Sequence, residues 1–479
     1  MEKLQNYIGG ELCAPAQGEY LDNYEPAKGE VYSLIPRSGA EDVAAAVKAA
    51  EAAFPAWSAL SNAERSKHLM AVSNRIAERL DELAMAESRD NGKPFKLAQS
   101  VDIPRARDNF AFFATAILHQ EDEFHNMGTK GFNYTLRQPL GSVACISPWN
   151  LPLYLLTWKI APALVSGNCV IAKPSEMTPY TAYLFSKICI NANLPPGVLN
   201  ILHGSGKTIG KAIVKHSKIK AISFTGGTDT GKEIAKQASH SLKKISLEMG
   251  GKNPVIIFDD CDYNTMIDSL MKSSFLNQGQ ICLAGSRIYI QKKIYEKFKK
   301  DFITKIKKLV IGNPLNKNTD QGAIISRDHL EKISKYIEHA KKEGAKIITG
   351  GYPPKLKGKY SSGWYFKPTV IEKISQSSIV NQNEIFGPVV TLNMFENEKD
   401  VIKFIEVIIQ STLYSKTWNI FPVCLCISCF RGITGIFLTI MSIGLSIAYC
   451  LRNHSISNNK VFFLKVINTF IACICTRDI

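Results

Sequence analysis

The sequence lacks the apolar leader of a secreted protein and the regular cysteine spacing of a disulfide framework. Residues 1–5 form no hydrophobic stretch, so we expect no signal peptide. The cysteines of the first 400 residues are irregularly spaced: Cys13, Cys145, Cys169, Cys189, Cys261 and Cys282. Unpaired cysteines are typical of a reducing compartment, so the two absences together predict a cytoplasmic protein.

The features of a nucleic-acid-binding protein are also missing. The chain carries 58 lysines and arginines against 42 aspartates and glutamates. These basic residues are scattered at helix-like spacing, and no basic stripe alternates with aromatic residues. Solvated helix faces explain this pattern, so we expect no nucleic-acid partner. No internal repeat is evident, and we expect no bound metal.

What the chain does contain, from Gly141 onward, is an alternation of buried strands and helices. Buried strands are predicted at residues 143–147, 168–174, 198–202 and 221–225. The segments between them, such as residues 179–192, have helical periodicity. Repeated β-α units favour a doubly wound parallel sheet, which binds dinucleotides at its strand ends. A second α/β unit begins near Lys252, so we predict an α/β fold with two units.

Three side chains are candidates for catalysis. Cys282 lies on a predicted turn between a helix and a strand, where it is either a nucleophile or a small buried residue. Asn150 follows a buried strand, so its amide either donates to a developing oxyanion or caps a turn. Glu248 precedes a flexible glycine pair and is either a mobile general base or a solvated carboxylate.

Three further segments could hold a dinucleotide. Lys173 and Glu176 follow a strand end and could hold the two hydroxyls of a ribose, or form an ordinary loop ion pair. The glycines of residues 224–231 either admit a pyrophosphate at a helix N-terminus or form a plain turn, because the segment is not G-x-G-x-x-G. Glu384 and Phe386 could hold a nicotinamide ribose and flank its ring, or form a solvated turn.

Six motifs occur in order within residues 5–400: S-P-W-N, K-P-S-E, F-T-G-G-T, L-E-M-G-G-K-N-P, Q-I-C and E-I-F-G-P-V. Together they resemble the aldehyde dehydrogenase superfamily. The resemblance implies NAD-dependent oxidation of an aldehyde to a carboxylic acid, with Cys282 as nucleophile, Glu248 as general base and Asn150 in the oxyanion hole. It also implies that NAD is bound by Ile146, Ser147, Pro148, Trp149, Lys173, Ser175, Glu176, Gly206, Phe224, Thr225, Gly226, Gly227, Thr228, Gly231, Met249, Gly250, Glu384 and Phe386.

The resemblance further implies the domains and the assembly. Residues 1–250 would form the NAD-binding domain and residues 251–406 the catalytic domain. A hairpin near residues 120–140 would join subunits into a homodimer or homotetramer. No membrane partner is expected for these two domains.

Residues 102–110 and 148–159 resemble one branch of this superfamily, that of 2-aminomuconic semialdehyde dehydrogenase. This resemblance implies that the substrate is 2-aminomuconate 6-semialdehyde, which is oxidised to 2-aminomuconate in tryptophan (kynurenine) catabolism. It also implies that Arg105 binds the substrate carboxylate, a task that suits the forked guanidinium. The alternative for Arg105 is an ion pair on a helix surface.

Residues 407–479 form an apolar tail that does not match the family. Its cysteines are crowded: Cys424, Cys426, Cys429, Cys450, Cys473 and Cys475. Residues 433–451 are uncharged and numerous enough for a transmembrane helix. Three interpretations follow: a truncated chain with an incomplete catalytic domain and doubtful activity, a membrane-tethered variant, or a non-enzymatic NAD-binding or interaction protein. The first interpretation, a truncated chain, predicts that apolar surface is left exposed and makes the formation of an oligomer doubtful.

Overall fold

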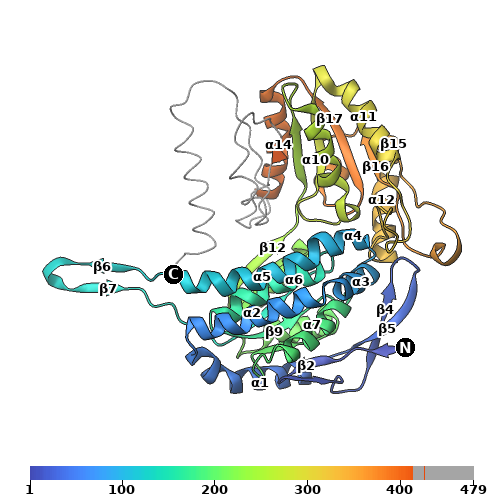
Figure 1. Cartoon of the computed structure of the whole chain (residues 1–479). Coiled ribbons are helices and arrows are strands. Elements are labelled where there is room, and N and C mark those ends of the chain that lie inside the picture. Colours follow the sequence, from blue (N-terminus) through green and yellow to red (C-terminus); the bar gives the residue numbers. More distant parts are fainter. Residues whose placement is uncertain (414–424, 427–479) are drawn as a thin grey trace.

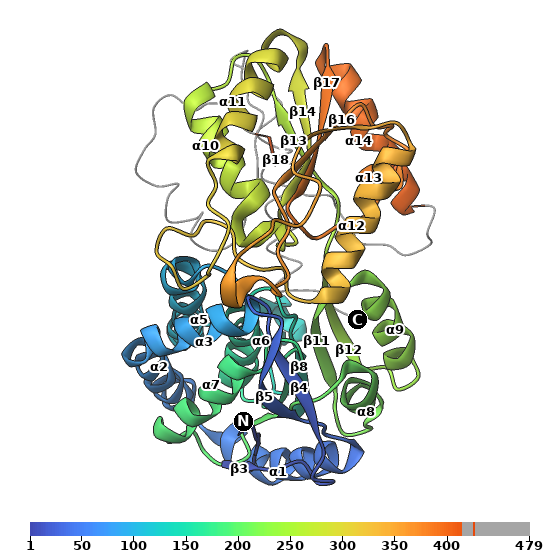
Figure 2. The same cartoon turned by 90° about the vertical axis from the view of Figure 1, so that its right-hand side faces the viewer.

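Two lobes, each built around its own sheet, lie one above the other in Figures 1 and 2. The structure is a computed structural model, and it describes residues 1–413 and 425–426. Helices cover both sheets, which confirms the predicted α/β fold. The division into an NAD-binding and a catalytic domain by function stays a prediction.

The lower lobe is organised around a seven-stranded sheet. Its strands follow the order β12 (Lys244–Met249), β11 (Ala221–Gly226), β8 (Ser142–Ile146), β9 (Cys169–Lys173), β10 (Leu199–Ile201), β2 (Asn6–Ile8) and β3 (Glu11–Cys13). The central strands are parallel, and Ile146 is in register with both Lys173 and Phe224. The segments after these three residues therefore leave the sheet at the same edge.

Helices pack on this sheet and bury a continuous apolar core. They are α1 (Ala40–Ala59), α2 (Asn62–Glu78), α3 (Leu80–Asn91), α5 (Ile103–Ala116), α6 (Pro152–Val165), α7 (Tyr180–Asn191), α8 (Lys211–Lys215) and α9 (Thr228–Ser239), with shorter turns at α4 (Phe95–Leu97), Ala98–Asp102 and Gly206–Gly210. A capping box starts α2, where Ser61 accepts from the Glu64 N–H and Glu64 accepts from the Ser61 N–H. The α3 helix ends at Gly92, whose φ of 85° favours glycine.

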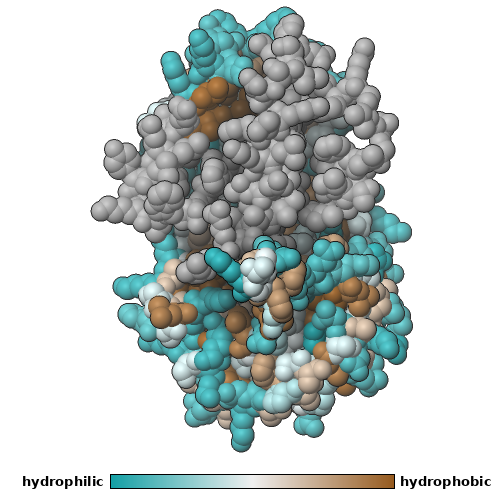
Figure 3. Space-filling view, turned by 90° about the vertical axis from the view of Figure 1, so that its left-hand side faces the viewer, coloured by the Kyte–Doolittle hydropathy of each residue, from teal (hydrophilic) through white to brown (hydrophobic). Residues whose placement is uncertain are grey.

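A two-stranded hairpin projects from the lower lobe (Figure 1). It consists of β6 (Phe124–Asn126) and β7 (Phe132–Tyr134), and it falls within the hairpin predicted near residues 120–140. Phe124 and Phe132 are 63% and 64% exposed. Figure 3 views the molecule from the side to which the hairpin points and shows hydrophobic residues among hydrophilic ones in the lower part. A role of this hairpin in assembly stays a prediction.

A smaller N-terminal sheet lies beside the lower lobe, with strand order β1 (Glu2–Lys3), β5 (Glu30–Pro36) and β4 (Tyr20–Glu25). The β4 and β5 strands are antiparallel. This sheet is tied to α3, since the Asp90 carboxylate accepts from the Asn23 amide and from the Tyr32 hydroxyl. The N-terminal segment therefore fixes the end of α3.

The upper lobe is organised around a six-stranded sheet. Its order is β15 (Lys346–Thr349), β16 (Thr369–Glu372), β17 (Val389–Phe395), β14 (Gly285–Gln291), β13 (Asn253–Ile257) and β18 (Leu425–Cys426). Its helices are α10 (Tyr263–Phe275), α11 (Tyr295–Lys307), α12 (Arg327–Lys342), α13 (Ile379–Gln382) and α14 (Glu398–Leu413). Stacked rings of Phe275, Phe298 and Phe302 fill the space between α10 and α11.

Part of the predicted tail is described. Residues Leu425–Cys426 form β18, which pairs in parallel with β13. The predicted transmembrane segment, residues 433–451, lies outside the described residues. Among the residues that the structure describes, no helix combines the length and the apolar character needed to cross a bilayer.

Candidate functional site

The loop that carries Cys282 lies between α10 and β14 and has an unusual backbone. Asn277 and Gln278 both adopt the left-handed region, with φ of 52° and 56°. Gly279 follows with φ of 67°, and a Cβ there would lie 2.3 Å from the Gly387 carbonyl oxygen. Only glycine allows this approach. The loop is therefore pressed against the segment that contains Glu384 and Phe386.

Hydrogen bonds bring Asn150 to this loop. The Asn150 side-chain amide donates to the Gln280 carbonyl at 2.9 Å. The Asn277 amide donates in turn to the Asn150 carbonyl, also at 2.9 Å. On the other side, the Asn253 amide donates to the Cys282 carbonyl at 2.6 Å. The structure thus brings the predicted oxyanion donor and the predicted nucleophile together across the two lobes.

The Cys282 thiol is half-buried and acidic residues surround it. Burial raises its pKa to about 11, and the charges of Glu384 and Glu248 act in the same direction. The backbone N–H groups of Cys282 and Leu283 donate to the sulfur and partly oppose this rise. The thiol therefore keeps its proton at neutral pH and needs a base. Glu248 lies on β12, is exposed, and is close enough to influence the thiol.

Arg105 and the Cys282 thiol both lie near Tyr154. Burial raises the pKa of Tyr154; the charge of Arg105 opposes this rise, and Asp102 and Cys282 add to it. Tyr154 therefore connects the region of Arg105 with that of Cys282. The Arg105 side chain is partly exposed near the start of α5. A cation and the candidate nucleophile therefore both lie close enough to Tyr154 to influence its hydroxyl.

The predicted ribose-binding pair lies beyond the end of β9. The buried Lys173 ammonium donates to the Glu176 carboxylate at 3.0 Å, and the Gly206 N–H donates to its other oxygen at 3.0 Å. Burial by itself favours the neutral acid, but Lys173 and the Gly206 N–H outweigh it and lower the pKa of Glu176. The site thus offers an ionised acceptor and a cationic donor side by side, a donor set that fits the two hydroxyls of an adenosine ribose.

The glycines after β11 allow close packing at the N-terminus of α9. A Cβ on Gly226 would lie 2.5 Å from the Phe224 ring, and one on Gly231 would lie 2.5 Å from the Met249 sulfur. Gly227 is the N-cap residue of α9 and supplies no side chain to its first N–H groups. Free N–H groups at a helix N-terminus bind phosphate, so this geometry fits a pyrophosphate.

A carboxylate and three aromatic rings line the remaining part of the site. Glu384 lies over Gly250, where a Cβ would come within 2.3 Å of its carboxylate oxygens. Phe386 has a φ of 62°, and its ring meets Trp149 edge-on with centroids 5.3 Å apart. The His329 ring donates to the Phe386 carbonyl at 2.6 Å, and burial lowers the pKa of His329 to about 4. A neutral His329 therefore holds Phe386 in its strained conformation.

The remaining predicted cofactor residues lie at the ends of β8, β9 and β11 or in the segments that follow them: Ile146, Ser147, Pro148, Ser175, Thr225 and Thr228. Sequence reasoning missed two site residues, His329 and Lys159. Burial lowers the pKa of Lys159, while the nearby charges of Cys145 and Glu248 oppose this change. Lys159 is the single charged residue in the otherwise uncharged α6. A lone charge in an apolar helix is therefore the sequence feature that could have identified it. Nothing comparable distinguishes His329 within the polar α12.

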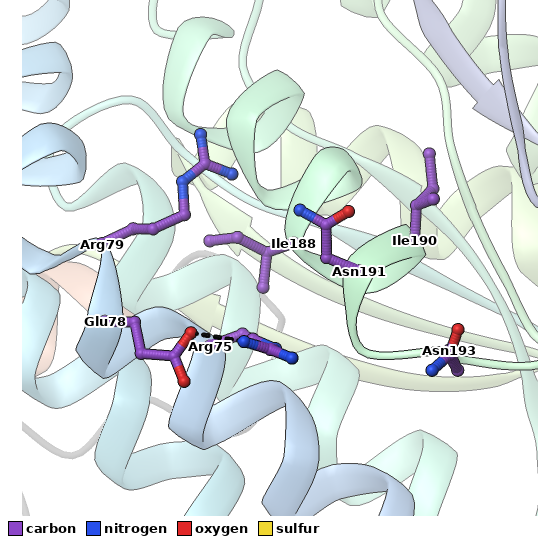
Figure 4. Close-up of a pocket in the computed structure, with 7 residues that line it drawn as sticks. All are labelled: Arg75, Glu78, Arg79, Ile188, Ile190, Asn191 and Asn193. Carbon is purple, nitrogen blue, oxygen red and sulfur yellow. Dashed lines mark hydrogen bonds and ion pairs between the residues drawn. The ribbon is translucent and has the colours of Figure 1, made fainter.

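A surface hollow elsewhere lies between α2 and α7 (Figure 4). It is lined by Arg75, Glu78, Arg79, Ile188, Ile190, Asn191 and Asn193. Arg75 is paired there with Glu78 at 2.7 Å. None of these residues belongs to the predicted site, so the hollow is separate from it.

Known proteins resemble this chain in both sequence and structure. The model of the aldehyde dehydrogenase family matches residues 13–407. The 2-aminomuconic semialdehyde dehydrogenase of Bos taurus is 46% identical over 403 residues, which cover 84% of this chain and 82% of the bovine protein. The protein of the same name from Homo sapiens gives the same values. A betaine aldehyde dehydrogenase of Staphylococcus aureus, solved in complex with NAD+, has a TM-score of 0.81 at 36% identity and covers 84% of this chain and 80% of its own. The matched residues 13–407 contain every predicted site residue.

Proposed function

Because the chain belongs to the aldehyde dehydrogenase family, we propose that it oxidises 2-aminomuconate 6-semialdehyde to 2-aminomuconate with NAD. The observation that carries this proposal is that Arg105 and Cys282 both lie near Tyr154 and influence its hydroxyl. A substrate with a carboxylate at one end and an aldehyde at the other matches a site with a guanidinium at one end and a thiol at the other. Four relatives that are 46% identical to this chain are named for that semialdehyde.

The catalytic residues act in two stages. Glu248 takes the proton of the Cys282 thiol, whose raised pKa makes this step necessary. The thiolate attacks the aldehyde carbon, and the Asn150 amide and the Cys282 N–H donate to the oxyanion that forms. When bound, NAD supplies the acceptor for the hydride that leaves this carbon. After Glu248 releases the thiol proton to solvent, it deprotonates a water molecule that attacks the thioester; the carboxylic acid leaves, and the Cys282 thiolate takes the proton back from Glu248.

The cofactor site favours NAD over its 2′-phosphorylated form. Lys173 and Glu176 would hold the adenosine ribose, and the N-terminus of α9 would receive the pyrophosphate. The ionised Glu176 carboxylate would repel a 2′-phosphate at the same place. Glu384 and Phe386 would hold the nicotinamide end close to Cys282.

We further propose that the protein acts in the cytoplasm and that its hairpin contacts a second subunit. An exposed pair of phenylalanines, Phe124 and Phe132, meets across the two hairpin strands with tilted rings whose centroids lie 5.5 Å apart. Such a cluster loses contact with water when a partner chain covers it. Sedimentation of the protein with Phe124→Ser and Phe132→Ser would test this contact, and an unchanged oligomeric state would contradict it.

The substrate assignment is tested by comparing two arginines of α5. We expect Arg105→Ala to raise KM for carboxylate-bearing semialdehydes by about 10- to 100-fold, because a charged hydrogen bond is lost. KM for propanal should change by less than about twofold. Arg107→Ala is the matched control, since Arg107 pairs with its exposed neighbour Asp108.

NADH formation gives the rate in each case. Equal effects of Arg105→Ala on both classes of aldehyde would contradict the substrate assignment. NADH formation that survives Cys282→Ala would contradict the proposed reaction itself.

A further inference from the structure

A lysine ammonium is buried directly behind the backbone of Asn150. Lys93 has no exposed surface, and its Nζ donates to the Asn150 carbonyl at 2.9 Å. The same Nζ contacts the Asp102 carboxylate and lies 3.6 Å from Glu87 Oε1. The mechanism above does not use any of these three side chains.

The cluster is costly to bury, so its presence needs an explanation. Glu87, Lys93 and Asp102 are all fully buried, and buried ionisable groups destabilise a fold unless they are paired. Burial raises the pKa of Glu87 to about 8, with Lys93 opposing the rise and Asp102 adding to it. Burial therefore favours the uncharged form of Glu87 at neutral pH. Apolar side chains would fill the same space at a lower cost.

The cluster joins the elements that surround the site. Lys93 follows the end of α3, and Asp102 precedes α5 by one residue. Glu87 Oε2 accepts from the Leu153 N–H at the start of α6, at 3.3 Å. One turn further along α5 lies Arg105, the proposed substrate-binding residue. The Lys93 ammonium therefore links the Asn150 carbonyl to the end of α3 and the start of α5, and Glu87 links the same cluster to α6.

A second donor reaches the same carbonyl from the upper lobe. The Asn277 amide donates to the Asn150 carbonyl at 2.9 Å, as Lys93 does from the lower lobe. Two donors on one oxygen determine the orientation of that peptide plane and hence the position of the Asn150 Cα. The direction in which the Asn150 side-chain amide points follows from this backbone position.

We propose that Lys93, held by Asp102, is a positioning residue that aims the Asn150 amide at the oxyanion formed on Cys282. This role depends on the proposed function in one respect: the Asn150 amide must donate to the oxyanion. A misplacement of about 1 Å at such a donor costs about 100-fold in rate, so a group behind the backbone has a measurable effect.

The test uses a reaction that needs neither NAD nor an aldehyde. In the hydrolysis of p-nitrophenyl acetate, the Cys282 thiolate adds to the ester carbonyl and the resulting oxyanion collapses, which releases p-nitrophenolate and leaves an acetyl thioester. Water then hydrolyses the thioester to acetate. The rate is taken as the difference from Cys282→Ala, so that only the thiol-dependent part counts.

The first variant is Lys93→Met with Asp102→Asn, which removes both partners of the ion pair and leaves no unpaired charge. We expect thiol-dependent ester hydrolysis and kcat for aldehyde oxidation to fall about 10- to 100-fold, with KM for NAD changed by less than about twofold. The matched control is Lys299→Met with Glu372→Gln, a 2.9 Å pair between α11 and β16. The proposal is overturned if the first variant hydrolyses the ester within about twofold of the wild-type rate, or if the control loses as much.

The second variant is the isosteric Glu87→Gln, which keeps the neutral form of the side chain at every pH. In the described part of the chain, the charged groups facing Glu87 are Lys93 and Asp102. Ionised Glu87 would compete with the Asn150 carbonyl for the ammonium. We therefore expect the hydrolysis rate of Glu87→Gln, divided by the wild-type rate, to be near one at pH 6.5 and to rise several-fold above about pH 8.

A ratio that stays constant from pH 6.5 to pH 9 overturns the proposal. The two assays also separate this proposal from the proposed function. A protein that hydrolyses the ester but forms no NADH with any aldehyde contradicts the function, while the variants still decide the role of Lys93.

Discussion

Two carboxylates raise the pKa of the Cys282 thiol and so disfavour the reactive thiolate. Burial, Glu384 and Glu248, in that order, raise its pKa to about 11. Glu248 thus has opposing effects, because its charge lowers the fraction of thiolate present at equilibrium, while its basicity is needed to move protons during the aldehyde reaction. These two effects can be separated by experiment.

The Glu248→Gln substitution removes the charge and the base together. We expect alkylation of Cys282 by iodoacetamide at pH 7.5 to become about two- to fivefold faster, because the thiol pKa falls. NADH formation should become about 100-fold slower, because the base is lost. Mass spectrometry of the Cys282 peptide and steady-state kinetics measure the two effects. Glu233→Gln on the exposed face of α9 is the control, and slower alkylation in Glu248→Gln would contradict this account.

At the scale of elements, the site depends on one tight loop. The loop from Asn277 to Cys282 holds two non-glycine residues in the left-handed region, and its Gly279 approaches the Gly387 carbonyl closely. The Gln278 amide ties the loop to the Ala323 carbonyl at 2.8 Å. The strain is therefore offset by contacts with distant segments of the upper lobe.

The Gly279→Ala substitution should displace this loop. Its new Cβ would collide with the Gly387 carbonyl oxygen, and φ would remain positive. We expect kcat to fall about 100-fold, together with a loss of about 1–3 kcal/mol in the free energy of unfolding. Gly312→Ala is the control, since no atom lies within 4 Å of its Cβ position. NADH formation and thermal unfolding check both expectations, and full activity in Gly279→Ala would show that the loop tolerates displacement.

Elements with strong periodicity could be predicted from the sequence. The strand predicted at 143–147 is β8 at Ser142–Ile146, and the helix predicted at 179–192 is α7 at Tyr180–Asn191. The β12 strand, which carries Glu248, was not predicted. It is an edge strand whose side chains are mostly exposed, so its apolar signal is weak and its place depends on pairing with β11.

The residues of the candidate site that could be predicted are those that lie within short sequence motifs. Asn150 and Cys282 were expected to act together, and the structure joins their segments through Gln280. The contact between Lys93 and Asn150 could not be predicted, because it connects positions 57 apart in the chain and neither local sequence indicates burial. Buried polar clusters of this kind depend on the packing of several helices.

At the scale of the whole molecule, the lower lobe contains a buried imidazole that affects stability. Burial, with the charge of Lys173 adding to it, lowers the pKa of His203 to about 3 from 6.5. Neither ring nitrogen has a hydrogen-bond partner among the residues that the structure describes. The folded protein therefore binds fewer protons here than the unfolded chain between these two pH values. The stability that His203 contributes is complete above pH 6.5 and is lost as the pH falls toward 3.

The His203→Leu substitution should remove this dependence. Between pH 6.5 and pH 4.5 the wild-type protein should lose about 1.4 kcal/mol of unfolding free energy per pH unit relative to the variant. At pH 8 the two proteins should differ by less than about 1 kcal/mol, because the ring has no hydrogen bond to lose. Urea unfolding at several pH values measures the difference. Parallel pH curves for wild type and variant, with exposed His339→Gln as control, would contradict the assignment.

The carbonyl of Asn150 also limits how the two lobes move. It accepts one hydrogen bond from Lys93 in the lower lobe and one from Asn277 in the upper lobe, each 2.9 Å long. A separation of the lobes by about 1 Å at this point would stretch the second bond beyond hydrogen-bonding range. A clamshell opening is therefore disfavoured at the very place where the thiol lies. Small molecules should reach Cys282 through the motion of side chains at the entrance, so their rate of entry should depend little on hinge flexibility.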